Sequence, residues 1–405
     1  MNISTHQTKR VVSGMRPTGA LHLGHYHGVI KNWLELQLTH DCFFFVADWH
    51  ALTTHYEETE EIEQHTLQMV IDWLACGISP SNAQLFIQSQ VPEHAQLQLL
   101  LSMITPLSWL ERVPSYKDQQ TKLTDKDLMT HGFLGYPVLQ AADILMYKAN
   151  YVPVGEDQVA HIELTREIAR RFNHIYGKEN DFKEKVENAI RHLGAKNGEI
   201  YLKLRRKHQE KGDEEARDTA VALVDSQQNI SYGDRQRLYG YLDGHTKLIL
   251  PEPQALLTKA TKIPGTDGQK MSKSYGNTIA LREPPEAIEK KLRTMPTDPA
   301  RKRREDPGDP KKCPVWKWHE IYSDSDTRQW VQKGCRSAGI GCLECKKPLI
   351  ESVQAEAEPI RLRCKEYEND KATVKKIITE ANEAVRDIAN DTLEEVKLAI
   401  KLIYR

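Results

Sequence analysis

The stretch Arg10-Val11-Val12-Ser13-Gly14-Met15-Arg16-Pro17-Thr18-Gly19-Ala20-Leu21-His22-Leu23-Gly24-His25 decides the fold of this chain of 405 residues. Its first five residues have the pattern of a short strand, Pro17-Thr18-Gly19 interrupts that strand, and residues 21–38 have helical character. Glycines at positions 14, 19 and 24 remove side chains around the turn, so the backbone can approach a flat base or a phosphate. The start of the helix then offers free amides and a positive dipole end to an anion.

Short apolar strands and longer helices alternate after this stretch. Residues 42–47 are apolar throughout, as expected for a strand covered on both faces, and residues 84–87 form another short strand. Between them, Leu67, Val70, Ile71 and Leu74 mark one face of a helix that ends at Gly77. This alternation predicts an α/β fold with a doubly wound, parallel, Rossmann-like sheet, in which ligands bind at the carboxyl ends of the strands.

The rest of the chain predicts three further regions. A helix from Tyr136 to residue 146, an extended segment at 151–154 and a helix from Gly155 to about Arg171 complete a catalytic domain at 1–176. Residues 177–248 are dense in charged residues and form a predicted insertion whose role the sequence does not assign. Residues 249–283 return to the catalytic domain, and residues 284–405 predict a separate helical domain.

Composition excludes some classes of protein. Hydrophobic residues make up 39% of the chain and charged residues 28%, no apolar run is long enough to span a bilayer, and no secretion signal is recognisable at the start. We therefore expect a cytoplasmic location. The formal net charge of −1 gives no global attraction to nucleic acid, so any site for a polyanion must be a local patch.

A second motif, Lys270-Met271-Ser272-Lys273-Ser274, lies between Gly265, Gly268 and Gly276. Two ammonium groups three residues apart on a flexible arm can close over a pyrophosphate leaving group and neutralise charge as it develops. His22 and His25 have the same spacing and lie on one face of the first helical turn. Taken alone, either motif is also compatible with solvated side chains and ordinary turn glycines.

Together and in this order, the two motifs resemble the signature pair of class I aminoacyl-tRNA synthetases, and the flanking residues are similar to the tryptophanyl-tRNA synthetase branch. The resemblance implies activation of L-tryptophan by ATP and Mg²⁺, transfer of tryptophan to the terminal adenosine of tRNA(Trp), and a homodimer. It implies catalytic roles for His22, His25, Lys270, Lys273 and Lys117. The implied ATP-binding residues are Arg16, Thr18, Gly24, His25, Asp157, Lys270, Met271, Ser272 and Lys273.

Residues 136–145 resemble the tryptophan-binding helix of that branch. The indole ring has one polar group, a donor N–H, so a selective pocket needs a buried acceptor, and Asp143 is suited to that role. A pocket with such an acceptor rejects an analogue that lacks the donor. Gln140 stands where some members carry methionine, which leaves its contact open. The implied tryptophan-binding residues are His50, Tyr136, Gln140, Asp143, Val152, Val154 and Gln158.

Four of the seven cysteines, Cys313, Cys335, Cys342 and Cys345, are separated by 21, 6 and 2 residues. Four thiolates suit tetrahedral zinc or a [4Fe–4S] cluster, and the spacing does not choose between them. A bacterial subset of tryptophanyl-tRNA synthetases with a C-terminal iron–sulfur site has a similar pattern, and this resemblance favours the cluster. A nearby basic run predicts contacts to tRNA phosphates, with a solvated surface as the alternative. Its residues are Arg301, Lys302, Arg303, Arg304, Lys311 and Lys312.

Two other functions stay open from the sequence. A tyrosyl-tRNA synthetase has a similar fold and motif pair and also uses an aspartate toward its substrate. A protein descended from a synthetase could instead serve as a catalytically silent RNA-binding protein or iron–sulfur sensor. The intact histidines and lysines of the two motifs speak against the silent protein, and the run Gly155-Glu156-Asp157-Gln158 favours tryptophan over tyrosine.

Overall fold

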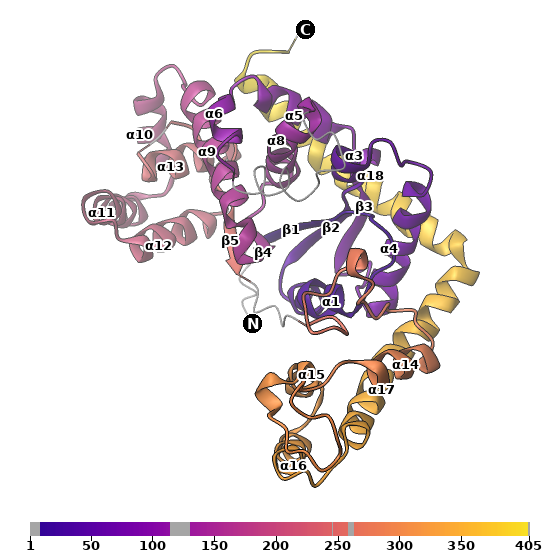
Figure 1. The fold of residues 1–405 in the computed structure, drawn as a ribbon. Coiled ribbons are helices and arrows are strands. Elements are labelled where there is room, and N and C mark those ends of the chain that lie inside the picture. The colour runs from indigo at the N-terminus through magenta and orange to yellow at the C-terminus, as the bar shows by residue number, and fades with distance from the viewer. Residues whose placement is uncertain (1–8, 114–129, 245, 258–262, 404–405) are drawn as a thin grey trace.

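The computed structural model describes residues 9–113, 130–244, 246–257 and 263–403 (Figure 1). Its centre is a parallel sheet of five strands in the order β3-β2-β1-β4-β5. The strands are β1 Arg10–Met15, β2 Asp41–Val46, β3 Ala83–Ile87, β4 Tyr151–Val154 and β5 Gln254–Leu257. The predicted doubly wound sheet is therefore confirmed, and the strand order reverses at β1, whose carboxyl end leads into the motif histidines.

Helices cover both faces of the sheet because the side chains of β2 alternate between two apolar cores. On one face, Phe44 stacks on Trp33 at 4.2 Å between ring centroids, from α2 Lys31–Leu36, next to α4 Ile62–Cys76. On the other, Phe43 stacks on Tyr147 at 4.9 Å, at the end of α8 His131–Met146. The helices α3 Asp48–His55, α5 Glu93–Ser102, α6 Leu107–Leu110 and α9 Val159–Tyr176 complete this half.

Three predicted helices differ in their limits. The first consists of α1 Leu23–His25, the π-helical turn η1 Tyr26–Ile30 and α2. Helix α8 begins at His131 rather than Tyr136, because Thr130 accepts a hydrogen bond from the Phe133 backbone at 3.1 Å, so Pro137 lies inside the helix. The predicted helix from Gly155 starts as the 3₁₀ turn η3 Glu156–Gln158, and α9 then continues to Tyr176.

The charged insertion folds into helices with a small core of its own (Figure 1). The helices are α10 Phe182–His192, α11 Ala195–Lys211, α12 Glu214–Asp225 and α13 Tyr232–Leu242. Tyr201 of α11 is fully buried in that core and donates to the carbonyl of Leu238 at 2.6 Å. The end of the insertion is joined to α9, because the hydroxyl of Thr246 donates to the carbonyl of Asn173 at 3.0 Å.

The C-terminal part is helical, as predicted, but its last helix returns to the sheet. This part contains α14 Pro285–Thr294, the 3₁₀ turn η5 Pro310–Lys312, α15 Pro314–Tyr322, α16 Ser325–Arg336, α17 Cys342–Asn369 and α18 Lys371–Ala399. Helix α18 packs against β3, and Val385, Ala389 and Leu393 lie in the same apolar core as Phe43. The apolar stripe that predicted a separate domain is thus buried against the catalytic half, and the domain limits stay predictions.

No helix among the described residues is long and apolar enough to cross a membrane.

Candidate active site

The two sequence motifs meet at the carboxyl end of β1, although more than two hundred residues separate them. Lys273, the first residue of the 3₁₀ turn η4 Lys273–Tyr275, donates from Nζ to the carbonyl of Thr18 at 2.9 Å. The segment after the lysine loop pairs with the segment before α1, because Leu23 donates to the carbonyl of Ile279 and Leu281 to that of Leu21, each at 3.0 Å. One ligand can therefore contact both motifs.

His22 and His25 lie together, with their ring centroids 3.8 Å apart. Burial, and then the charge of Lys273, lowers the pKa of His22 to about 4. Burial, together with His22 and Lys273, lowers the pKa of His25 to about 3. Both rings are therefore neutral at pH 7 and act through hydrogen bonds rather than charge. The backbone amide of His22 donates to Nδ1 of His25 at 3.2 Å, which leaves the proton of His25 on Nε2.

Gly24 and Gly19 are constrained for different reasons. A Cβ atom on Gly24 would lie 2.9 Å from the imidazole of His22, and it would meet Sδ of Met271 at an ordinary contact distance of 3.4 Å. Gly19 has a φ of 104°, which favours glycine, and would place its Cβ 3.2 Å from Nζ of Lys273. Gly24 is therefore required by the position of the His22 ring, and Gly19 by its backbone conformation beside Lys273.

Asn277 holds the lysine loop, a role that the sequence analysis missed. It is 2% exposed, and its Oδ1 accepts from the backbone amide of Ser272 at 2.7 Å. Its Nδ2 donates to Asp267 at 2.8 Å and to the carbonyl of Lys270 at 3.1 Å. A buried side chain that binds the backbone on both sides of a turn fixes the shape of that turn. Lys270 is exposed, and Met271 is buried in the main core.

Asp143 is the centre of a buried network at the ends of β2 and β3. It is 1% exposed, and it accepts from Nε2 of His50 at 2.8 Å, from Nε2 of Gln88 at 2.8 and 2.9 Å, and from Nδ1 of His94 at 2.6 Å. Nε2 of His94 in turn pairs with the hydroxyl of Tyr147 at 2.6 Å. Burial acts to raise the pKa of Asp143, but the hydrogen bonds from His50 and His94 outweigh it and lower the pKa.

The sequence analysis found Asp143 and His50 but missed Gln88, His94 and Tyr147. Gln88 directly follows β3, so its place at the carboxyl end of a strand was an available signal. His94 lies on α5 and Tyr147 just after α8, where no sequence pattern separates them from ordinary core residues. Only the tertiary fold brings the three side chains to one carboxylate.

Other predicted tryptophan and ATP residues surround this network. The hydroxyl of Tyr136 bonds Nε2 of His161 at 2.7 Å, and the rings of Tyr136 and His50 lie 6.3 Å apart. Burial lowers the pKa of Arg16, and Tyr136 lies near enough to act on that pKa in the opposite direction. Asp157 accepts from Gln158 at 3.2 Å at the start of α9.

The remaining predicted residues of this half lie on α8 and β4, or outside the described residues. Gln140 is half-buried on α8, three residues before Asp143 and on the same helical face. Val152 and Val154 are buried on β4. Lys117 lies outside the described residues.

The four cysteines come together around one small cavity formed by α15, α16 and α17. Asp298, Arg301 and Lys346 also line it. None of the seven cysteines, all of which lie in described segments, forms a disulfide. Among the described residues, no group of three or more His, Cys, Asp or Glu side chains is gathered closely enough to hold a single metal ion.

The basic run divides into one buried residue and several exposed ones. Arg301 is 9% exposed, and its guanidinium donates to the carbonyls of Arg304 at 2.9 Å and Ile340 at 2.5 Å and lies 4.0 Å from Sγ of Cys335. Arg301 is therefore not available for the predicted tRNA contact, because its side chain supports the cysteine cavity instead. The exposed members are Lys302, Arg303, Arg304, Lys311 and Lys312.

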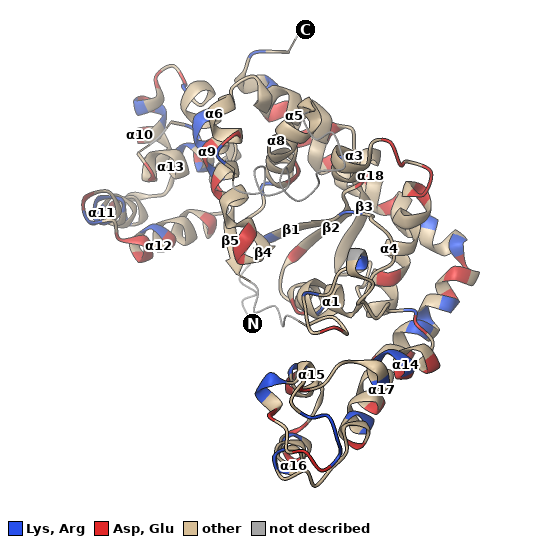
Figure 2. Ribbon diagram, in the orientation of Figure 1, with Lys and Arg blue, Asp and Glu red and all other residues tan. Residues whose placement is uncertain are grey.

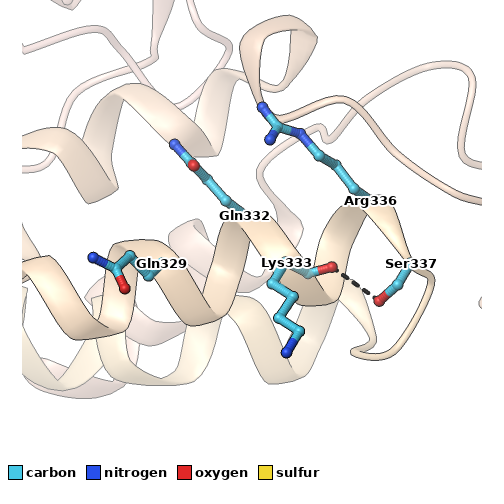
Figure 3. Close-up of a pocket in the computed structure, with 5 residues that line it drawn as sticks. All are labelled: Gln329, Gln332, Lys333, Arg336 and Ser337. Carbon is cyan, nitrogen blue, oxygen red and sulfur yellow. Dashed lines mark hydrogen bonds between the residues drawn. The ribbon is translucent and has the colours of Figure 1, made fainter.

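The region around the cysteine cavity, formed by α15, α16 and α17, has further basic surface. Figure 2 shows blue segments over α15, α16 and the adjoining loops. Arg304 pairs with Glu344 at 3.0 Å, and this ion pair offsets part of its positive charge. A shallow pocket on the outer face of α16 is lined by polar and cationic side chains (Figure 3). These are Gln329, Gln332, Lys333, Arg336 and Ser337.

Comparison with known proteins places this geometry in a family. The model of the family "tRNA synthetases class I (W and Y)" matches residues 4–196 and 224–357. The chain is 61% identical to a tryptophan–tRNA ligase of Ralstonia nicotianae, over 98% of this chain and 99% of the relative. It is 43% identical to a tryptophan–tRNA ligase of Thermotoga maritima, over 98% and 100%.

Solved structures agree with the sequence relatives. Tryptophanyl-tRNA synthetase from Campylobacter jejuni, crystallised with ADP and tryptophan, has a TM-score of 0.72 and 28% identity, with 97% of this chain and 99% of that chain covered. A tyrosyl-tRNA synthetase from Archaeoglobus fulgidus has a TM-score of 0.54 at 19% identity, which shows a shared fold. With its two motifs in contact and a family model that matches most of its length, the chain belongs to the class I tRNA synthetases of the tryptophan and tyrosine group.

Proposed function

We propose that this protein is a tryptophan–tRNA ligase, which activates L-tryptophan with ATP to tryptophanyl-adenylate and pyrophosphate and then transfers tryptophan to the terminal adenosine of tRNA(Trp). The single observation that carries this proposal is the contact between the motifs, Lys273 Nζ to the Thr18 carbonyl at 2.9 Å, at the same carboxyl edge of the sheet as the network of the buried Asp143. The high identity to named tryptophan–tRNA ligases supports the same activity.

The nucleotide half of the site supplies geometry and charge. The turn that precedes α1 is proposed to receive the triphosphate, where the neutral ring of His25 offers its Nε2 proton. Lys270 and Lys273 lie on the loop that covers this turn, where their ammonium groups can neutralise charge that develops on the pyrophosphate. Mg²⁺ enters with ATP and screens its β and γ oxygens. The carboxylate of tryptophan attacks the α-phosphorus, and pyrophosphate leaves.

The amino-acid half of the site explains the choice of substrate. Asp143 is a buried acceptor held by donors from three other elements, and such an acceptor suits the indole N–H. A ring without this donor that displaced His50 from the carboxylate would not replace the lost hydrogen bond, which costs more than the loss of an apolar contact. Tyr136 and Gln158 are proposed to contact the α-ammonium group, with Gln140, Val152 and Val154 along the ring.

ATP–pyrophosphate exchange driven by single amino acids tests this proposal. Exchange that depends on L-tryptophan is the expected result. Exchange with tyrosine but not tryptophan would assign the protein to the sister activity, and no exchange with either would favour a catalytically silent RNA-binding protein. The second step is measured by the charging of tRNA(Trp) transcripts, with tRNA(Tyr) as the control.

For the cysteine cavity we propose a [4Fe–4S] cluster, with zinc as the alternative. The residues fit an anionic cluster, because four thiols and the cations of Arg301 and Lys346 line one cavity. Four thiols also suit a tetrahedral zinc ion, and the resemblance of the cysteine spacing to the iron–sulfur subset favours the cluster. When bound, the cluster would hold α15, α16 and α17 together, and no redox step is required. Visible absorption and acid-labile sulfide in anaerobically purified protein distinguish the two groups.

The proposed tRNA surface lies on the same unit as the cavity. Its members are the exposed basic residues Lys302, Arg303, Arg304, Lys311 and Lys312, and the polar pocket on α16 extends the surface. We further propose a homodimer that acts in the cytoplasm, where charged tRNA is used. Replacement of Lys311 and Lys312 by alanine should weaken the charging of tRNA and leave pyrophosphate exchange unchanged.

A further inference from the structure

The carboxylate of Asp143 is held by two kinds of donor. Gln88 and His94 have no exposed surface, whereas the side chain of His50 is 12% exposed. Oδ1 accepts from Gln88 and His94, and Oδ2 accepts from Gln88 and His50. His50 is therefore the only one of these donors that can move aside without opening the core. An incoming N–H donor can take the place of His50 on Oδ2 while the other contacts remain.

Asp143 and Tyr147 together determine which nitrogen of His94 carries the proton. The Tyr147 hydroxyl has no exposed surface, and burial raises its pKa well above the ordinary value, so it keeps its proton. The ionised Asp143 carboxylate can only accept, so Nδ1 of His94 carries the N–H, and in the neutral ring Nε2, 2.6 Å from the hydroxyl, accepts its proton. The N–H on Nδ1 donates to Oδ1 of Asp143 at 2.6 Å. The direction of each hydrogen bond thus follows from the one before it.

The supporting side chains are fixed by the core. The ring of Tyr147 stacks on Phe43 of β2 at 4.9 Å and meets Phe86 of β3 edge-on at 5.4 Å. His94 lies beside Phe86, with their ring centroids 6.1 Å apart. Close packing of this kind holds a side chain in one rotamer and lets it orient a neighbour.

We propose that Tyr147 and His94 are positioning residues, which hold the Asp143 carboxylate so that Oδ2 can exchange its bond with His50 for a bond with the indole N–H of tryptophan. This inference rests on the proposed function, because it assumes that tryptophan is the substrate and that Asp143 accepts from its indole. Neither Tyr147 nor His94 needs to touch tryptophan. Their substitution should change how well the site distinguishes tryptophan from an analogue without the indole N–H, in addition to any effect on folding.

The experiment compares L-tryptophan with 3-benzothienyl-L-alanine, an analogue in which sulfur replaces the indole N–H and the ring keeps its shape. Binding of each compound to the full-length protein is measured by titration calorimetry. The variants are Tyr147→Phe, His94→Leu and His94→Asn, since an asparagine amide can still donate from the position of Nδ1. Tyr201→Phe is the matched control, because Tyr201 is an equally buried tyrosine with a single hydrogen bond, far from the site.

The expected result is a change in the ratio of the two affinities. In Tyr147→Phe the preference for tryptophan over the analogue should fall about fivefold to tenfold, the scale of one ordinary hydrogen bond. The preference should be lost in His94→Leu, partly restored in His94→Asn and unchanged in Tyr201→Phe. If Tyr147→Phe and His94→Leu weaken both ligands equally, the two residues are merely structural and the inference is wrong. If wild-type protein binds both ligands equally, Asp143 does not recognise the indole N–H and the proposed role of Asp143 is wrong. If it binds neither ligand, the proposed function of the protein is wrong.

Discussion

Removal of the Lys273 ammonium group tests the contact on which the active site depends. In Lys273→Ala, the hydrogen bond from Nζ to the Thr18 carbonyl at 2.9 Å is lost at an exposed position. The loss of one such hydrogen bond costs about 1 kcal/mol of folding free energy, and for a chain of this length the melting temperature should fall by about 2 °C or less. The fold should therefore survive the substitution.

The catalytic effect should be much larger. The ammonium group lies at the turn where the triphosphate is proposed to bind, and removal of one such electrostatic donor costs about 2.7–4 kcal/mol of transition-state stabilisation. This corresponds to a decrease of about 10²–10³-fold in the rate of tryptophan-dependent pyrophosphate exchange. Equilibrium binding of tryptophan should change little, because Asp143 and its donors stay in place.

The assay needs a control of equal charge. Lys291 donates to the carbonyl of Thr278 at 2.8 Å and to Glu283, so Lys291→Ala removes one ammonium group that supports the segment after the loop. Pre-steady-state formation of the adenylate is measured for both variants beside the wild type. A decrease of less than about threefold in Lys273→Ala, or a decrease equal to that in Lys291→Ala, would show that Lys273 does not act on the reacting phosphates.

Four further predictions address other parts of the structure. Gly24→Ala should cost about 1–3 kcal/mol in thermal unfolding and slow pyrophosphate exchange, since its Cβ would lie 2.9 Å from His22 and 3.4 Å from Met271. The pKa values of His22 and His25 are about 4 and 3 in the folded protein, so the unfolded chain binds more protons below about pH 6.5 and stability should fall from there toward pH 4. Urea unfolding should show a shallower pH dependence in His25→Asn. Asp143→Ala should lose selectivity against phenylalanine, measured by exchange with each amino acid. Cys342→Ser should lose iron and acid-labile sulfide and make α15–α17 sensitive to proteolysis, while pyrophosphate exchange continues.

Local patterns in the sequence predict the elements of the fold well. The apolar run of β2 and the helical face ended by Gly77, whose φ is 107°, follow from residues close together in the chain. The approach of Lys273 to Thr18 was predicted through the resemblance of two motifs to a known family, since spacing alone does not bring distant segments together. The predicted start of α8 at Tyr136 was wrong, because Thr130 caps the helix and the first residue of α8 is His131.

Side-chain environments were harder to predict than elements. The run Arg301-Lys302-Arg303-Arg304 looks uniform, yet only Arg301 turns inward, where the carbonyls of Arg304 and Ile340 accept its guanidinium protons. The network around Asp143 draws one side chain each from α3, η2 Gln88–Gln90 and α5, and no periodicity predicts such convergence. A burial pattern shows that a residue is inside, but the partner that satisfies it depends on which elements the fold brings alongside.

One partly buried carboxylate links the proposed nucleotide site to the helices around the cysteine cavity. Glu356 of α17 accepts from Nε2 of His27, 329 residues away in sequence, and from Nζ of Lys31, each at 2.7 Å. Burial acts to raise the pKa of Glu356, but His27 and Lys31 bring it to about 2. His27 lies two residues after His25, while α17 begins with Cys342 about 20 Å before Glu356. Glu356 therefore fastens α17 to the helical segment that follows the motif histidines, at a point about 20 Å along α17 from Cys342, which is why the loss of the cysteine site can loosen α15–α17 without displacing His25.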